Sequence, residues 1–186
     1  MALTIADKYY LQAIDGYPFD LKEVIKYLSY ALSYDDAHAP ANCLMGQLYM
    51  VQLKDYQKAE HYLNQAIIAD FSHPDGYKYL ALLKVWTNDI DGAFKIISYA
   101  MKIKAMNRSQ LLWVKATALE CRMDFSKAKE VLKEAELIYI QTEVISELDI
   151  MLARINKKLK SRKMLQKKQK RMLQIRQFND SFFSKH

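Results

Sequence analysis

The residue types that most often carry out chemistry in proteins are scarce in this sequence. Four His and two Cys occur among its 186 residues. His38 follows the pair Asp35-Asp36, and His73 follows Asp70, so each has carboxylates beside it that could share a metal ion. Both positions fall in expected turns, where Asp and His more often satisfy nearby backbone groups than bind metal. We therefore expect no metal site there.

The remaining His, Cys and Gly residues do not form any of the motifs that commonly bind metals or phosphates. His61 lies within an expected helix and His186 is the last residue, and neither belongs to a His-x-x-x-His or His-Glu-x-x-His motif. There is no Cys-x-x-Cys pair, and the four glycines are scattered rather than gathered in a phosphate-binding loop. The sequence predicts a binding protein without catalytic residues, metal or cofactor, rather than an enzyme.

The two cysteines and the N-terminus favour a cytoplasmic location. Cys43 and Cys121 each lie in an apolar helical pattern, which predicts two buried, reduced thiols. Two cysteines are too few for a disulfide framework. Asp7 and Lys8 interrupt the first apolar residues, so no secretory signal is evident. No window approaches the roughly 20 apolar residues of a membrane span.

Composition narrows the fold class. The chain is 51% hydrophobic and 26% charged, which excludes a disordered or collagen-like protein. Only four Gly and three Pro occur, and a barrel or a sandwich needs many more turns than these can supply. We therefore expect an all-α protein.

One sequence pattern recurs four times at intervals of 35, 34 and 35 residues. Each copy starts with an aspartate: Asp20, Asp55, Asp89 and Asp124. Four residues later comes a small or β-branched residue, then a bulky one, then an alanine: Val24, Leu28 and Ala31; Ala59, Leu63 and Ala66; Ala93, Ile97 and Ala100; Ala128, Leu132 and Ala135. Small residues also recur 35 apart upstream: Gly46, Ala81 and Ala116.

Each mark of this pattern has a structural interpretation. An Asp before an apolar-periodic run is typical of a helix N-cap. Small residues seven apart share one helix face and let a neighbouring helix come close. The repeat therefore predicts helix–turn–helix units. The expected first helices are 5–15, 40–53, 74–87 and 109–123, and the expected second helices are 21–34, 56–70, 90–104 and 125–139.

The pattern resembles the tetratricopeptide repeat (TPR) family, whose period is 34. The matching residues are Gly46, Tyr49, Tyr56, Ala59 and Ala66 in one unit, and Tyr77, Leu80, Ala81, Ala93 and Ala100 in the next. The resemblance implies a right-handed α-solenoid of about four TPR-like helix hairpins with a C-terminal capping helix that is extended as a basic helix. The repeat array would span 1–140, with units 5–34, 39–71, 74–105 and 109–139.

In this family the first helices line a concave groove. The resemblance places an apolar, aromatic surface there, which is suited to a protein or peptide segment with apolar anchors. Trp86 and Trp113 could instead only fill space between helices. The implied groove residues are Tyr10, Ile14, Tyr17, Cys43, Gln47, Met50, Val51, Lys78, Leu82, Val85, Trp86, Trp113, Thr117, Glu120 and Cys121.

Family members that bind acidic peptide C-termini carry a clamp of Lys, Asn and Arg on these positions. This chain offers Lys78 alone, with Cys43, Gln47, Trp113 and Thr117 where polar clamp residues would be needed. Because a terminal carboxylate with acidic neighbours needs two or more cations, we expect no carboxylate clamp.

The C-terminal part has a different character. Ile145, Leu148, Leu152, Ile155 and Leu159 follow the spacing of an amphipathic helix, which predicts a capping helix over 141–159. Residues 160–186 are expected to form a basic helical or disordered tail. From residue 154 onward there are twelve Lys and Arg and one acid. The basic arm comprises Lys157, Lys158, Lys160, Arg162, Lys163, Lys167, Lys168, Lys170, Arg171 and Arg176.

Three interpretations of this arm stay open. It could be a solvated terminal helix. It could bind an acidic protein or, less favoured, a membrane surface or nucleic acid. It could also fold back into the groove of the same or another copy through Phe178, Phe182 and Phe183, and a homodimer is plausible.

These observations predict a non-enzymatic protein–protein interaction module, a scaffold that binds its partner in the groove. The size, repeat number and apolar groove also resemble the small TPR chaperones of type III secretion translocators, which makes a chaperone-like role the first alternative. The second alternative is a protein associated with nucleic acid or a membrane surface that acts through its basic arm.

Overall fold

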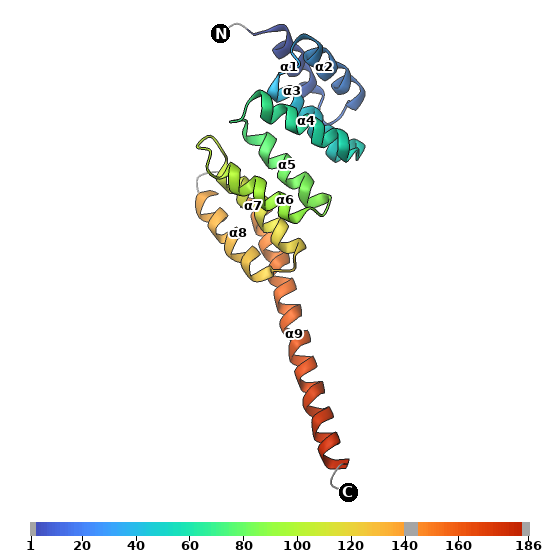
Figure 1. Cartoon of the computed structure of the whole chain (residues 1–186), viewed down its shortest axis with the longest axis vertical. Helices are drawn as coiled ribbons and strands as arrows, with labels where there is room; N and C mark the ends of the chain where they lie inside the picture. The colour runs from blue at the N-terminus through green and yellow to red at the C-terminus, as the bar shows by residue number, and fades with distance from the viewer. Residues whose placement is uncertain (1–2, 140–144, 184–186) are drawn as a thin grey trace.

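The computed structural model of the chain describes residues 3–139 and 145–183, and within these ranges the fold is all-helical without a strand. Figure 1 shows the helices following one another from the N-terminal end, with the last one projecting away from the others. The helices are α1 (Ile5–Gly16), α2 (Leu21–Tyr34), α3 (Ala39–Leu48), the π-helix η1 (Tyr49–Leu53), α4 (Tyr56–Ala69), α5 (Pro74–Trp86), α6 (Ile90–Ala100), α7 (Arg108–Cys121), α8 (Phe125–Tyr139) and α9 (Ile145–Phe183).

Helices α1 to α8, which we call the body, pack in consecutive pairs. The pairs are α1 with α2, α3 with α4, α5 with α6, and α7 with α8. The first helices of successive pairs also touch, because α3 contacts α5 and α5 contacts α7. The buried face of each second helix carries the recurring residues of the sequence pattern: Val24, Leu28 and Ala31, and their counterparts in α4, α6 and α8, are at most 2% exposed.

The small residues upstream of each aspartate permit this close packing. Gly46, Ala81 and Ala116 are all buried. A Cβ atom added to Gly46 would lie 2.7 Å from Cγ of Leu63 on α4. The expectation that a small residue lets the neighbouring helix approach is therefore confirmed at this position.

The repeating aspartates cap the second helices as expected. Their carboxylates accept hydrogen bonds from the backbone N–H three residues later, at 2.9 to 3.3 Å. The residue before three of these aspartates has a left-handed backbone, which closes the turn from the first helix: Lys54, Asn88 and Met123 have φ of 56°, 63° and 58°.

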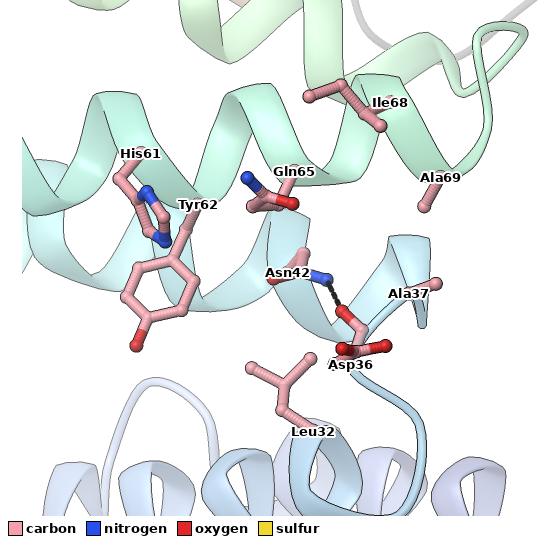
Figure 2. A pocket seen from close by; sticks show the side chains of 9 residues that line it. All are labelled: Leu32, Asp36, Ala37, Asn42, His61, Tyr62, Gln65, Ile68 and Ala69. Atoms are coloured by element: carbon pink, nitrogen blue, oxygen red, sulfur yellow. Dashed lines mark hydrogen bonds between the residues drawn. The ribbon is translucent and has the colours of Figure 1, made fainter.

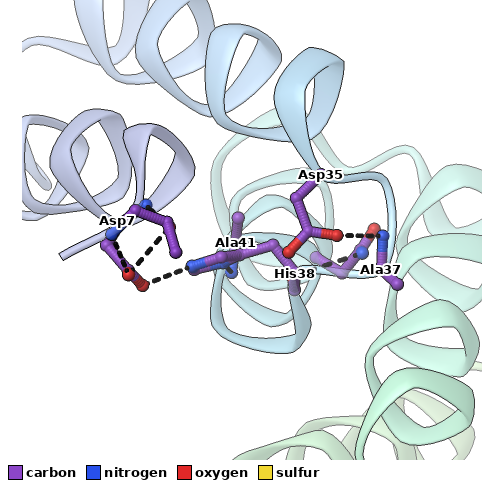
Figure 3. Close-up of polar contacts among 7 residues, drawn as sticks. Asp7, Asp35, Ala37, His38 and Ala41 are labelled. Carbon is purple, nitrogen blue, oxygen red and sulfur yellow. Dashed lines mark hydrogen bonds and ion pairs between the residues drawn. The ribbon is translucent and has the colours of Figure 1, made fainter. Parts of the chain in front are cut away.

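The first helices have N-caps of a kind that the sequence pattern did not identify. Thr4 caps α1 and Asn107 caps α7, whereas histidines cap α3 and α5. Nδ1 of His38 accepts from the N–H of Ala41 at 3.1 Å, and its Nε2 lies 3.0 Å from the Asp7 carboxylate on α1 (Figure 3). An Nδ1 that accepts leaves the proton on Nε2, so His38 donates to Asp7. Expecting these histidines to satisfy local backbone groups was correct.

The positions of the caps explain the unequal repeat lengths. Each cap of a second helix is followed 18 residues later by the cap of the next first helix, for example Asp20 by His38. The distance from the cap of a first helix to the cap of the second helix in the same pair varies. It is 17 residues from His38 to Asp55 and 16 from His73 to Asp89. The π-helical turn η1 takes up the extra residue between His38 and Asp55. The stretch 40–53, expected as one α-helix, is therefore corrected to α3 followed by η1.

Helix α9 is anchored on the last pair of the body. Leu148, Met151 and Ile155 are buried against α7 and α8, and Leu152 and Leu159 pack on the same cluster. The side chain of Ile145, which was expected in this set, lies outside the described residues. The expected boundary between a capping helix ending at 159 and a separate tail falls inside one continuous helix, and the expected start at 141 also lies outside the described residues.

Other helix ends differ from expectation by only a few residues, with one exception. Helix α6 stops at Ala100 rather than at 104, and a series of turns leads to α7. In the described ranges no helix has a stretch long and apolar enough to cross a bilayer.

Candidate functional site

A cavity of about 370 Å³ lies between α5, α7 and the start of α9. Three of the residues that line it, Lys78, Leu82 and Trp113, belong to the groove predicted from the sequence. We call it the α5–α7 cavity. Its other lining residues, which sequence reasoning missed, are Tyr79, Gln110, Glu147 and Leu148.

Helical spacing could have found part of this missing set. Gln110 precedes Trp113 by three residues and therefore lies on the same face of α7. Glu147 and Leu148 come from α9, far along the sequence, and folding of the chain packs α9 against α7 and α8. No local pattern in the sequence could have placed them at this cavity.

The charge of Lys78 is already compensated inside the protein. Its Nζ lies 2.5 Å from an oxygen of Asp75 and 4.3 Å from the centroid of the Tyr79 ring. Burial works to lower the pKa of Lys78, but the hydrogen bond and the charge of Asp75, together with contributions from Tyr79, outweigh it, and the pKa is raised. Lys78 is therefore a cation with an internal partner.

Two further titratable groups in this region are withdrawn from solvent, because Cys43 on α3 is buried and Tyr10 on α1 is half-buried. Burial raises the pKa of the Cys43 thiol to about 12, and Asp75 adds to this effect. Burial likewise raises the pKa of Tyr10, with smaller contributions from Cys43 and Asp75. At neutral pH the thiol is therefore protonated, which makes it a poor nucleophile.

The other predicted groove residues fall into three groups. Tyr10, Tyr17, Gln47, Val51 and Thr117 are half-buried, and several are engaged within the protein: Gln47 donates to the Tyr17 hydroxyl and Thr117 donates to the carbonyl of Trp113. Ile14, Trp86 and Cys121 are exposed, but none of them lines the α5–α7 cavity. Cys43, Met50, Val85 and Glu120 are buried.

Several of these placements correct the prediction. Met50 is fully buried and Val85 nearly so, because both belong to the core cluster formed by residues of α4, α5, α6 and α7. Cys121, expected to be buried, is exposed because it is the last residue of α7. Trp86 is 42% exposed at the end of α5, with the Lys54 ammonium 5.1 Å from its ring centroid.

Glu120 has a structural role that the groove prediction did not include. Its carboxylate, 9% exposed, accepts hydrogen bonds from Arg154 at 2.7 and 2.9 Å and from Lys158 at 2.7 Å. Burial raises the pKa of Glu120, but the hydrogen bonds from Arg154 and Lys158 outweigh it and hold the pKa below its usual value. Lys158 of the predicted basic arm is therefore part of the anchor of α9.

The rest of the basic arm is exposed. All described side chains of residues 160–177, which we call the distal segment, are exposed, and Arg162 donates back to the carbonyl of Met123. Lys157 is exposed as well. The helix runs away from the body (Figure 1), so its backbone does not fold back toward the groove of the same copy. The side chains of Phe178, Phe182 and Phe183 lie outside the described residues, and contact with another copy stays a prediction.

A second cavity, of about 440 Å³, is lined by residues of α2, α3 and α4 and of the turn between α2 and α3 (Figure 2). The Asn42 side chain at its base donates to the backbone carbonyls of Asp36 and His38. This amide therefore serves the turn before α3. His61 and Tyr62 on α4 also line the cavity, and none of its residues belongs to the predicted groove.

Among the described residues, no group of three His, Cys, Asp or Glu side chains is placed to hold a metal ion. Comparisons of the chain with protein-family models and with curated proteins found no match.

Proposed function

We propose that this protein is a non-enzymatic interaction module, a TPR-like α-solenoid that binds a peptide segment in the α5–α7 cavity. The regular alternation of N-caps, the pairing of consecutive helices and the buried small residues support the repeat architecture. The observation that carries the proposal is the cavity itself, because three residues from the expected groove converge there.

The chemistry of the lining favours a segment with an apolar anchor. Tyr79, Leu82 and Trp113 offer apolar surface, and aromatic residues in pockets are typical anchors of binding energy. Gln110 can both donate to and accept from a peptide backbone. Lys78 already pairs with Asp75, so it does not favour a terminal carboxylate as the ligand.

Two tryptophans provide a matched test. Trp113 lines the cavity, whereas Trp86 lies outside it. Peptides would be selected with the full-length protein from a random library displayed on phage, and their affinity would be measured by calorimetry. Trp113→Leu should weaken the selected peptides by about tenfold or more, the loss expected at a binding hot spot. Trp86→Leu should leave the affinity within about twofold.

An equal loss of peptide affinity in the two variants would contradict the proposal. So would a selected peptide whose affinity changes in neither variant. A thermal unfolding curve of each variant separates loss of binding from loss of folding. Selection that yields only acidic C-terminal peptides would also contradict it, because the compensated Lys78 should not favour them.

A further inference from the structure

The distal segment of α9 exposes apolar side chains that nothing in the body covers. Met164, Leu165, Met172, Leu173 and Ile175 are 58 to 64% exposed. At about 1.5 Å per residue this segment extends over roughly 25 Å, well beyond the last contact with α7 and α8. A helix that only needs to stay in solution gains nothing from five exposed apolar residues at these positions.

These apolar residues share one side of the helix. With about 100° between successive residues, all five fall within one half of the circumference. The opposite half carries Lys160, Lys163, Lys167, Lys170 and Arg171. Lys168 and Arg176 lie among the apolar residues, where their long aliphatic stems can lie along an apolar surface while their charges reach its polar edge. The distal segment is therefore amphipathic.

The apolar side continues onto the body. Leu165 lines two adjoining shallow hollows, one shared with Met172 and Leu173 and the other shared with Met123 and Phe125 at the turn between α7 and α8. Met123 is 66% exposed. Cations flank this strip, including Arg122, Lys157 and Arg162. The exposed strip thus combines apolar side chains with a rim of positive charge.

The positive charge of the distal segment favours some binding partners over others. Residues 160–177 contain eight Lys and Arg and no Asp or Glu. A second copy of the same segment would bring like charges together, which disfavours pairing of two such helices. Nucleic acid would use the cations but leave the apolar side in water. An anionic bilayer surface fits both halves of the helix, because its charged headgroups attract the Lys and Arg side and its apolar interior accepts the apolar side.

We propose that the distal segment of α9 is a docking helix for bilayers that contain anionic phospholipids. It lies in the plane of the interface, with Leu165, Met172 and Ile175 turned into the headgroup layer and the surrounding Lys and Arg near lipid phosphates. The described part of the chain has no helix that could span a bilayer, so the attachment is peripheral. This inference does not depend on the α5–α7 cavity.

The test is sedimentation of the full-length protein with vesicles. One set contains phosphatidylcholine alone, and the other contains phosphatidylcholine mixed with phosphatidylglycerol. We expect binding to the anionic vesicles, little binding to the neutral ones, and a decrease as salt is raised. A charge variant, Lys163→Gln with Lys167→Gln and Lys170→Gln, should weaken binding by more than about tenfold.

An apolar variant separates membrane docking from simple charge attraction. Leu165→Gln with Met172→Gln and Ile175→Gln keeps the net charge and uses a good helix former, and it should also weaken binding by more than about tenfold. Matched controls outside the distal segment should bind as the unchanged protein does: Lys22→Gln, Lys102→Gln and Lys133→Gln for charge, and Ile68→Gln, Leu137→Gln and Ile150→Gln for apolar exposure.

Three results would overturn the proposal. The first is no binding of the unchanged protein to anionic vesicles, as expected if the arm serves an acidic protein. The second is equal binding to neutral vesicles. The third is loss of binding in the charge variant but not in the apolar one, especially if duplex DNA competes, because this would indicate an electrostatic arm for nucleic acid. The melting temperature should be unchanged in the two distal variants, whose substituted side chains are exposed.

Discussion

The second helices of the body and the distal segment of α9 are all helical, but different interactions keep them so. Each second helix of the body begins at an aspartate N-cap and buries a Leu or Ile against its partner. The distal segment buries none of its described side chains. The body therefore depends on tertiary packing, whereas the distal segment depends on intrinsic helix propensity and on the anchored turns before it.

The largest difference between the two regions should appear when a leucine is truncated. Leu63 is fully buried under Gly46, so Leu63→Ala should lower the free energy of unfolding by about 2–5 kcal/mol. Leu173→Ala in the distal segment should change it by less than about 0.5 kcal/mol. Urea unfolding of both variants measures this contrast, and similar losses would mean that the distal segment packs on the body in solution.

The junction between the two regions should show an intermediate effect. Glu120→Gln removes the charge that Arg154 and Lys158 share, and should cost about 1–3 kcal/mol, as for hydrogen bonds to charged groups. Glu136→Gln on exposed α8 surface is the control. Hydrogen exchange should become faster from Leu148 to Lys158 in the first variant, and unchanged exchange there would show that Glu120 does not hold α9.

A smaller effect of opposite sign is expected at the turn before α8. Met123 has a left-handed backbone, which costs most L-residues about 1 kcal/mol but is tolerated by asparagine. Because its side chain is mostly exposed, Met123→Asn should raise the free energy of unfolding by up to about 1 kcal/mol. Asn88→Met is the reciprocal variant and should lower it. Chemical denaturation of both checks the sign.

Low pH should destabilise the body through protonation of a carboxylate that the distal segment lacks. Hydrogen bonds from His38 and Thr4 lower the pKa of Asp7 to about 2 from 3.8. Because the pKa is lower in the folded protein, Asp7 stabilises the body fully above pH 3.8, and this contribution is lost as the pH falls through about 2. The distal segment has no acid to titrate. Asp7→Asn should flatten the dependence of the urea midpoint on pH between 4 and 2, and an unchanged slope would contradict this.

The sequence predicted those parts of the fold that depend on local spacing. The aspartate caps and the buried Val24, Leu28 and Ala31 with their counterparts follow from residue type and helical period alone. The π-helical turn did not follow, because it depends on how the chain accommodates one extra residue, and the contact of His38 with Asp7 did not follow, because that carboxylate comes from another helix.

The candidate site was predicted only in part, for the same reason. Spacing on one helix placed Lys78 and Leu82 together, but the burial of Met50 and Val85 depends on how closely the neighbouring helices approach. Glu120 was expected to face a ligand, yet it faces Arg154, 34 residues further along the chain. Contacts of this kind are determined by the packing of distant elements, which periodicity does not describe.

The anchor of α9 also makes the helix a lever arm. From Arg162, which donates to the carbonyl of Met123, the helix extends roughly 30 Å to Phe183, and none of the described side chains of 163–177 is buried. A tilt of about 10° at the anchor would move the far end by about 5 Å, close to one helical turn. Small rearrangements around Glu120 and the apolar contacts beside it are thereby geometrically amplified at the far end of the helix.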